Sequence, residues 1–305
     1  MSVQTLAAWL RCPNCVKPLQ ALDPPDPARS PGSSGPLELP AARADASPVV
    51  LGCASGHRFD VNRRGYVTLL PPRTKVVGDT AAMLSERTAL LESGAYIPIR
   101  DALIAAVRPF RPLRVLDSGT GTGWYLHGVL EALSADGSSD DGGPRGLASD
   151  LSPAAIARAM RGRSDVDGLV AEVHAPLPVR DGVVDAVTVV FAPRNPAEFA
   201  RVLRPGGVLA VAVPRAEHLG ELRAASGGML DVPEGKADTL GTTLAAWFSP
   251  ASAQHVRYEL PLDADRARQL QGMGPSAHHA QASVPVTSLP ASVTVSVDVL
   301  AFVRR

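Results

Sequence analysis

The chain has 305 residues, of which 45% are hydrophobic, and its formal net charge is zero. This length exceeds that of one typical domain, so we expect a core of ordinary size and a second, smaller module. No apolar stretch approaches the roughly 20 residues that span a bilayer, and the first residues lack the basic-then-apolar pattern of a secretory signal. We therefore expect a cytoplasmic protein without a membrane partner.

The three cysteines all lie within the first 53 residues. They form Cys12-Pro-Asn-Cys15 and, with a histidine, Cys53-Ala-Ser-Gly-His57. Four soft ligands in two pairs suit tetrahedral zinc in a structural site without an open position. The alternatives are a thioredoxin-like redox pair, for which the surrounding sequence offers no βαβ frame, and unpaired structural cysteines. The sequence thus predicts a small zinc-binding module at the start of the chain.

Two further stretches of this module have a recognisable pattern. Residues 23–48 are rich in Pro, Ala, Gly and Ser, which predicts a flexible loop. Residues 59–70 alternate between apolar and polar side chains, which predicts a short pair of strands. Pro71 and Pro72 then end the pair, so we place the boundary of the module at residue 72.

Positive charge gathers between residues 51 and 80, where the acidic residues are Asp60 and Asp79 alone. Clustered cations, and the guanidinium fork in particular, match phosphate groups. The alternative is a solvated charged face without a partner. Aromatic residues are only 4% of the chain, so phosphate and shape contacts would have to dominate over base stacking. The sequence predicts a nucleic-acid-binding surface at Arg58, Arg63, Arg64, Arg73 and Lys75.

Residues 115–123 read Val-Leu-Asp-Ser-Gly-Thr-Gly-Thr-Gly and predict a strand, a tight turn and the start of a helix. Glycine lets the backbone turn sharply and lets a ligand approach, while the helix start offers unpaired N–H groups. The spacing of Gly119, Gly121 and Gly123 differs from the dinucleotide fingerprint G-x-G-x-x-G. With Asp117 at the strand end, the turn resembles that of S-adenosylmethionine-dependent methyltransferases, where it holds the methionine part of the cofactor.

The segments that follow fit the same fold. Residues 146–150 predict a second strand that ends in Asp150, whose carboxylate could accept both ribose hydroxyls of an adenosine cofactor. A loop is predicted before it, at residues 134–144. Residues 181–193 hold a β-branched run bounded by turn residues, as in a strand covered on both faces. Residues 202–213 predict the end of a helix, a Pro-Gly-Gly turn and a further strand. Together they predict a Rossmann-like α/β fold of the class I methyltransferase type.

The motifs taken together resemble those of the 23S ribosomal RNA guanine-N1 methyltransferases. The resemblance rests on C-x2-C…C-x3-H, HRFDVNRRGYVTLLPP, GDTAAMLSERTALLESGAYIPIRDAL and VLDSGTGTG, in this order, and extends to about residue 222. Residues 78–103 are its most specific part, because zinc modules and methyltransferases in general do not share them. The resemblance implies a zinc-binding, RNA-recognising module at 1–72, a helical connector at 73–111 and a methyltransferase domain at 112–305. The Ala-, Arg- and Pro-rich composition is similar to that of the actinobacterial branch, which acts in tylosin-type macrolide resistance.

The resemblance also implies individual site residues. The zinc ligands of the family fall on the cysteines and histidine of the two pairs, and its cofactor contacts fall on Tyr96, Thr122, Gly123 and His218. Without the resemblance, Tyr96 would be interpreted as a core aromatic residue and His218 as a loop histidine. The complete predicted cofactor set is Tyr96, Gly119, Gly121, Thr122, Gly123, Asp150 and His218, and the metal set is Cys12, Cys15, Cys53 and His57.

The resemblance implies methyl transfer from S-adenosylmethionine to N1 of a guanine in a 23S rRNA hairpin. Such an enzyme must align the two reactants and assist loss of the N1 proton. The sequence names no base, and residues 191–194 are the first place to search for one. The rival hypotheses are a small-molecule methyltransferase of antibiotic biosynthesis and a cofactor-binding nucleic-acid sensor without catalysis. A homodimer that clamps the RNA is a further hypothesis, since one basic module is small for a structured hairpin.

Overall fold

The computed structural model describes residues 3–22, 49–72, 74, 77–137, 143–226, 236–273 and 289–305. The loop predicted at 23–48 lies outside these residues, as do Arg73 and Lys75 of the predicted RNA-binding surface. The same holds for residues 138–142 within the loop predicted at 134–144.

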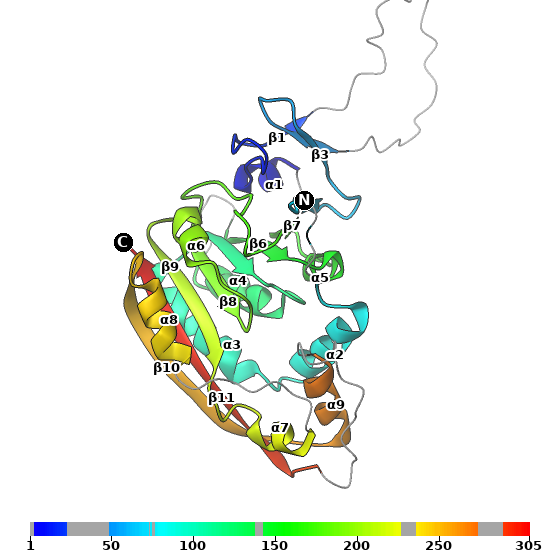
Figure 1. Cartoon of the computed structure of the whole chain (residues 1–305), viewed down its shortest axis with the longest axis vertical. Coiled ribbons are helices and arrows are strands. Elements are labelled where there is room, and N and C mark those ends of the chain that lie inside the picture. The colour runs from blue at the N-terminus through cyan, green and yellow to red at the C-terminus, as the bar shows by residue number, and fades with distance from the viewer. Residues whose placement is uncertain are drawn as a thin grey trace, which may run out of the picture.

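Within the described residues, an eight-stranded sheet forms the centre of the molecule, in the order β10-β11-β9-β8-β5-β6-β7-β4 (Figure 1). The strands from β9 to β4 in this order are parallel, and β10 and β11 are antiparallel to each other, with β11 also antiparallel to β9. The strands are β4 (Val67–Thr68), β5 (Arg114–Ser118), β6 (Arg145–Asp150), β7 (Val166–Val170), β8 (Val184–Val190), β9 (Leu203–Pro214), β10 (Phe248–Pro261) and β11 (Ser292–Arg304).

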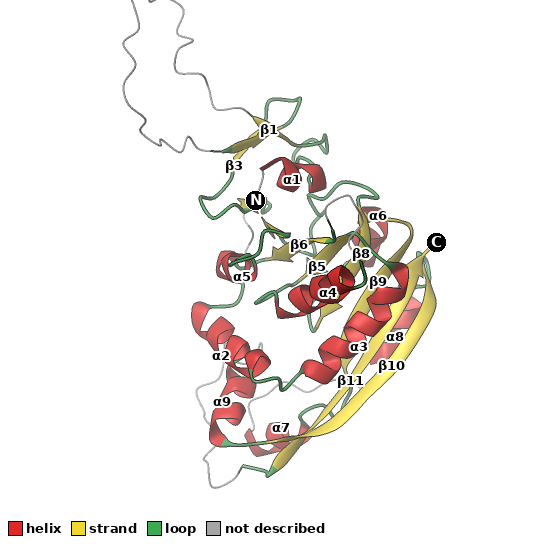
Figure 2. Cartoon of the chain, turned by 180° about the vertical axis from the view of Figure 1, so that it is seen from behind, coloured by secondary structure: helices red, strands yellow, loops and turns green. Residues whose placement is uncertain are grey.

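Helices cover both faces of this sheet, because parallel strands need crossover connections that run over a face. Successive strand residues point to opposite faces, so Val115 belongs to one apolar core and Leu116 to the other. One face packs against α3 (Ile97–Val107), α4 (Trp124–Ala135) and α5 (Pro153–Ala159), and the other against α1 (Val3–Trp9), α6 (Pro196–Val202) and α8 (Lys236–Leu244) (Figure 2).

The strands predicted at the glycine turn, before Asp150 and at 184–213 are all present. They confirm the predicted Rossmann-like α/β fold of the class I methyltransferases. In β9 the strand continues through the Pro-Gly-Gly segment that we expected to be a turn before it. Its pairing with β8 shifts there, from Val184 opposite Leu203 to Ala186 opposite Val208. The carboxyl ends of β5, β6 and β8 meet at one edge of the sheet, where ligands bind in open α/β folds.

The N-terminal region contains a second, three-stranded antiparallel sheet of β1 (Gln20–Leu22), β2 (Val50–Gly52) and β3 (Arg58–Asp60). The strand pair expected within residues 59–70 is reduced to one bridge between Val61 and Val67. The two strands belong to different sheets, since β3 pairs with β2 and β4 pairs with β7. Alternating side chains indicate that a segment is a strand, but they do not identify its partner.

Contacts from α1 and the residues after it fix the N-terminal region to the large sheet. Trp9 Nε1 donates to Asp167 Oδ2 over 2.8 Å, and the Asp167 side chain is fully buried. Arg180 donates to the carbonyl oxygens of Ala7, Leu10 and Leu19 over 2.9, 2.8 and 2.6 Å. The N-terminal region is therefore packed directly on the large sheet.

The predicted connector forms two helices, α2 (Ala81–Glu92) and α3. The Thr80 hydroxyl caps α2 by accepting from Met83 N over 3.3 Å. Helix α2 packs against α9 (Ala264–Gly272), and the remaining described helices are η1 (Arg108–Phe110) and α7 (Gly220–Ser226). Among the described residues, no helix has the length and apolar character needed to cross a membrane.

Candidate cofactor and metal sites

The glycine turn lies between β5 and α4 and has a backbone that other residues could not adopt without strain. Gly119, Gly121 and Gly123 have φ angles of 75°, 54° and 80°, in the left-handed region. A Cβ at Gly119 would lie 2.4 Å from the Cβ of Ala192, and one at Gly123 would lie 2.8 Å from the Cα of Ala159. The turn therefore lies directly against its neighbours and requires glycine.

Asp150, at the carboxyl end of β6, lies beside this turn as predicted. Its Oδ2 accepts from Gly121 N over 2.9 Å, and its Oδ1 accepts from Ser152 N over 2.9 Å. Burial raises the pKa of this carboxyl, while the two backbone donors oppose the change. Each carboxylate oxygen has a second lone pair. The side chain is thus held in one orientation with acceptor capacity to spare for hydroxyl groups.

Asp117, at the end of β5, is almost completely buried. Its Oδ1 accepts from the Thr188 hydroxyl of β8 over 2.7 Å. Burial raises the pKa of Asp117 to about 6, although the hydrogen bond from Thr188 favours the charged form. The carboxyl therefore joins two central strands beneath the glycine turn.

Two buried tyrosines lie next to this region with unsatisfied hydroxyl groups. Tyr96 precedes α3 and is 1% exposed, and Tyr125 lies in the first turn of α4. Among the described residues, neither hydroxyl has a hydrogen-bond partner. Burial raises the pKa of each phenol, so both are neutral. A buried hydroxyl without a partner is rare in folded proteins and is expected where a ligand supplies the missing group. Sequence reasoning did not identify Tyr125.

His218 lies after β9 and is 8% exposed. Its Nδ1 accepts from Ser296 N over 3.2 Å, so the ring hydrogen must be on Nε2. Burial lowers the pKa of His218 to about 4, and the Arg223 charge adds to this effect. The ring is therefore neutral at ordinary pH and has a fixed tautomer with an Nε2–H donor.

Three aromatic rings from distant parts of the chain meet at this edge of the sheet. The ring centroid of Phe191 lies 6.2 Å from that of Tyr96 and 5.8 Å from that of His218. Tyr96 and His218 are 6.3 Å apart. The structure thus brings together the predicted cofactor residues 96 and 218 with the segment 191–194. The remaining predicted cofactor residue, Thr122, is buried in the turn between Gly121 and Gly123.

The four predicted metal ligands converge, although they come from two segments of the chain. Their ligand atoms all lie within 4.8 Å of one another. Cys12 Sγ and Cys53 Sγ lie 3.5 and 3.4 Å from His57 Nδ1, and Cys15 Sγ lies 3.5 Å from Cys53 Sγ. A tetrahedral site with metal–sulfur bonds of about 2.3 Å has ligand atoms roughly 3.7 Å apart. The chemistry and spacing of this cluster therefore fit a metal ion.

Three of the predicted RNA-binding residues lie in the described part of the chain. Arg58, Arg63 and Arg64 are exposed, and their guanidinium groups make no ion pair with a described residue. They are carried by β3 and by the turn that follows it, close in sequence to His57.

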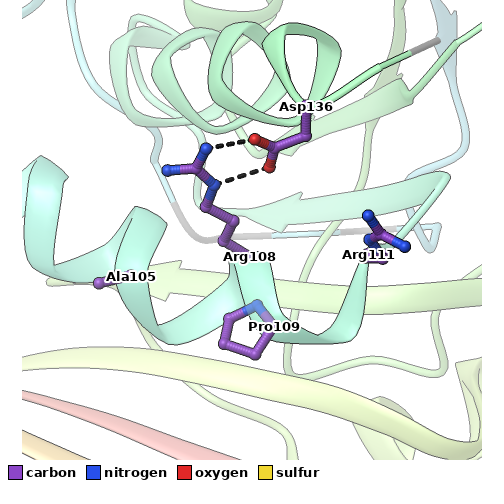
Figure 3. A pocket seen from close by; sticks show the side chains of 5 residues that line it. All are labelled: Ala105, Arg108, Pro109, Arg111 and Asp136. Atoms are coloured by element: carbon purple, nitrogen blue, oxygen red, sulfur yellow. Dashed lines mark hydrogen bonds and ion pairs between the residues drawn. The ribbon is translucent and has the colours of Figure 1, made fainter.

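A surface hollow of about 350 Å³ lies away from all these residues (Figure 3). It is lined by Ala105, Arg108, Pro109, Arg111 and Asp136 and is spanned by the two hydrogen bonds between Arg108 and Asp136. The Arg108 guanidinium holds the pKa of the Asp136 carboxyl below its ordinary value. None of the predicted cofactor, metal or RNA-binding residues contributes to this hollow.

No model of a known protein family matches the chain. Curated relatives do match over most of its length. A 23S rRNA (guanine(748)-N(1))-methyltransferase from Streptomyces fradiae is 37% identical over 280 residues, which are 90% of this chain and 88% of that protein. The chain belongs to the 23S rRNA guanine-N1 methyltransferase family.

A protein of Micromonospora griseorubida, provisionally named as a member of this methyltransferase family, is 36% identical over 313 residues and 96% of both chains. Among solved structures, a SAM-dependent methyltransferase from Aquifex aeolicus has a TM-score of 0.38 and 17% identity, over 63% of this chain and 82% of that one.

Proposed function

We propose that this member of the family transfers a methyl group from S-adenosylmethionine to N1 of a guanine in a 23S rRNA hairpin. The guanine would correspond to position 748, which is the target in the name of the Streptomyces fradiae relative. The observation that carries the proposal is the 37% identity to that relative over nearly the full length of both proteins. We infer a macrolide-resistance role of the tylosin type and a cytoplasmic location from the same relationship.

The residues at the carboxyl edge of the sheet fit S-adenosylmethionine. The glycine turn offers a surface without Cβ atoms, Asp150 has free acceptor capacity for ribose hydroxyls, and the Tyr96 hydroxyl is buried without a partner. Thr122 and Gly123 lie at the start of α4, and His218 presents an Nε2–H donor. When bound, the cofactor supplies an activated methyl group on a sulfonium centre.

The contribution of the chain to the reaction is positioning. The guanine N1 must approach the methyl carbon in line with the bond that breaks, and the new N–C bond forms as N1 loses its proton. Groups that stabilise negative charge on the purine favour that proton loss. Because its Nδ1 accepts from Ser296, neutral His218 offers a donor at this edge of the sheet and not a base.

In the N-terminal region we assign structural zinc to Cys12, Cys15, Cys53 and His57. We assign RNA phosphate contacts to Arg58, Arg63 and Arg64, and by sequence also to Arg73 and Lys75. The division into a module at 1–72, a connector at 73–111 and a methyltransferase domain at 112–305 belongs to the same proposal. A homodimer as the RNA-binding form is tested by light scattering of the metal-loaded protein with and without the hairpin.

The deciding experiment combines methyl incorporation with reverse transcription. The protein, labelled S-adenosylmethionine and 23S rRNA should give incorporation and one new reverse-transcription stop, because methylation at N1 blocks base pairing. Replacing the guanine at the stop by adenine should abolish both signals. Absence of incorporation into the RNA, with intact binding of S-adenosylhomocysteine, would overturn the proposal in favour of a small-molecule enzyme or a sensor.

Exchange of Arg63 and Arg64 for Ala tests the RNA contacts separately. We expect RNA affinity to fall by about tenfold at moderate salt, with the salt slope reduced by about two, since each phosphate contact contributes about one. Cofactor affinity should stay unchanged. Equal RNA affinity in the variant and the parent would show that these side chains form a solvated face.

A further inference from the structure

Phe191 has an unusual combination of backbone strain and exposure. It directly follows β8 with a φ angle of 54°, in the left-handed region, and its side chain is 40% exposed. A bulky residue in this region is a backbone outlier and persists where the surrounding structure enforces it. Such strain clusters at functional sites. An exposed phenyl ring in this position gains little for folding, because burial of apolar surface is what stabilises the fold.

The neighbours of the Phe191 ring place it at the boundary of the proposed cofactor site. On one side it contacts Tyr96 and lies nearly parallel to the His218 ring, with 22° between the planes. The next residue, Ala192, lies against Gly119 of the glycine turn so closely that a Cβ there would be 2.4 Å away. The ring therefore packs against residues of the proposed cofactor site, while 40% of the side chain remains exposed.

Arg194, three residues further along the same turn, has no counterion among the described residues. Its side chain is partly buried, and it makes no hydrogen bond or ion pair with any residue in the described ranges. Burial lowers its pKa. A guanidinium that loses water without gaining an acceptor is destabilising unless an anion completes the site.

The turn that carries these two side chains is fixed at its far end. Asn195 Nδ2 donates to Val173 O over 2.8 Å, and Asn195 Oδ1 accepts from Glu198 N over 3.4 Å at the start of α6. A fixed turn can present an aromatic face and a cation in a defined arrangement. This is the arrangement that recognises a nucleotide, whose base stacks on a ring and whose phosphate accepts from arginine.

We propose that the turn at residues 191–194 receives the target nucleotide, with the open face of the Phe191 ring stacked on the extruded guanine and the Arg194 guanidinium bound to an adjacent phosphate. This proposal rests on the proposed function. The N1 atom lies on the Watson–Crick edge, so the base must leave its pair and its stack before transfer. A phenyl ring next to the methyl-donor region replaces the lost stacking and orients the edge that reacts.

The first test uses three variants of Phe191, with steady-state methylation of the hairpin and calorimetry of S-adenosylhomocysteine binding. F191Y keeps a stacking face and should retain kcat/KM within about threefold. F191L keeps an apolar side chain and F191G removes the strain. Both lack the ring, so the KM for RNA should rise by about tenfold, which corresponds to one stacked base. Cofactor affinity should change by less than about threefold in all three. Trp247, an aromatic residue of similar exposure between α8 and β10, provides the control W247L.

The second test uses R194Q and R194K over a series of salt concentrations. R194Q should raise the KM for RNA and reduce the salt slope of binding by about one, whereas R194K should restore the slope. R257Q is the control, because Arg257 also lacks an ion pair within the described residues but lies on the outer strand β10. Thermal melts and cofactor binding verify that each variant is folded.

Two results would overturn the proposal. If F191L weakens cofactor binding and leaves the KM for RNA unchanged, the ring is a wall of the cofactor site. If R194Q leaves the salt slope unchanged, the phosphate contact is absent. Both results require a parent protein that methylates the hairpin, so they differ from failure of the proposed function, in which the parent itself is inactive on 23S rRNA.

Discussion

The glycine turn and the Cys-His cluster are both proposed ligand sites, but the protein shapes them by different means. The turn is part of the central sheet: its N–H groups at Gly119 and Thr120 donate to Ser149 O over 2.8 and 3.0 Å. The Cys-His cluster joins two segments that flank residues 23–48 and that form strands of only three residues. One site is built from backbone geometry, and the other from four side chains.

This difference predicts different failures. The shape of the turn is enforced by steric contacts and buried strands, so it persists without its ligand. The N-terminal cluster lies among strands of only three residues each, and in small metal-binding modules the metal supplies much of the folding free energy. Loss of the metal should therefore unfold its region, whereas a change in the turn should weaken binding in a folded protein.

The largest expected effect follows replacement of one metal ligand. C53S should release the metal and lower methylation of 23S rRNA by about 100-fold or more, because a structural site with three ligands binds poorly. Cofactor binding at the sheet should change by less than about threefold. Metal content, methylation and calorimetry measure the three quantities. A metal-free variant that methylates RNA normally would remove the contrast between the two sites.

The next effect concerns the glycine turn. G119A would place a Cβ 2.4 Å from Ala192 at a φ angle of 75°, so we expect cofactor affinity to fall by more than tenfold and stability by about 1–3 kcal/mol. G162A is the matched control, because Gly162 has a φ angle of 72° but no neighbouring atom within 4 Å of the added Cβ. G162A should lose stability because of backbone strain, but its cofactor affinity should stay unchanged. Calorimetry and urea unfolding distinguish the two variants.

A smaller effect is expected where the N-terminal region packs on the central sheet. R180A removes the donors that hold the carbonyl groups of Ala7, Leu10 and Leu19. Hydrogen bonds to charged groups contribute about 1.5–3 kcal/mol each and are not additive, so the docking of α1 should weaken by roughly 2–4 kcal/mol. Faster hydrogen exchange confined to residues 3–22 would measure it. Equal exchange in the variant and the parent would show that the apolar contacts of α1 suffice.

The smallest effect concerns the buried acid under the turn. The pKa of Asp117, about 6, lies above its ordinary value of 3.8, so between pH 4 and 6 this carboxyl binds more protons in the folded protein than in the unfolded chain. The contribution of Asp117 to the free energy of unfolding therefore falls as pH rises through this range. D117N abolishes this dependence and should increase stability at pH 7 by up to about 3 kcal/mol. Urea unfolding at four pH values tests the sign, and an unchanged slope in D117N would contradict it.

Local patterns in the sequence predicted the parts of the site that depend on local physics. The strand, glycine turn and helix at 114–135 follow from periodicity and from backbone freedom, which a short stretch of residues determines. The convergence of Cys12, Cys15, Cys53 and His57 was predicted from their spacing and from the chemistry of sulfur and imidazole. Asp150 follows from its place at the end of a strand, which the structure confirms beside the turn.

The remaining features depend on contacts between distant residues. Residues 59–70 alternate between apolar and polar side chains as in an edge strand. Only the folded sheet identifies β7 as the partner of residues 67–68. Tyr125 and Phe191 are unremarkable in sequence, since their properties arise from an unsatisfied hydroxyl and from a strained backbone. The tautomer of His218 is determined by the backbone of Ser296, 78 residues away.

The bond between Trp9 and Asp167 has a consequence for biosynthesis, because 158 residues separate its two partners. At elongation rates of about 5–20 residues per second, the ribosome delivers the second partner roughly 10–30 s after the first. During this interval the apolar side of α1 has no surface to cover, while the thiols nearby are already available. All four predicted metal ligands are therefore synthesised before the surface on which α1 docks.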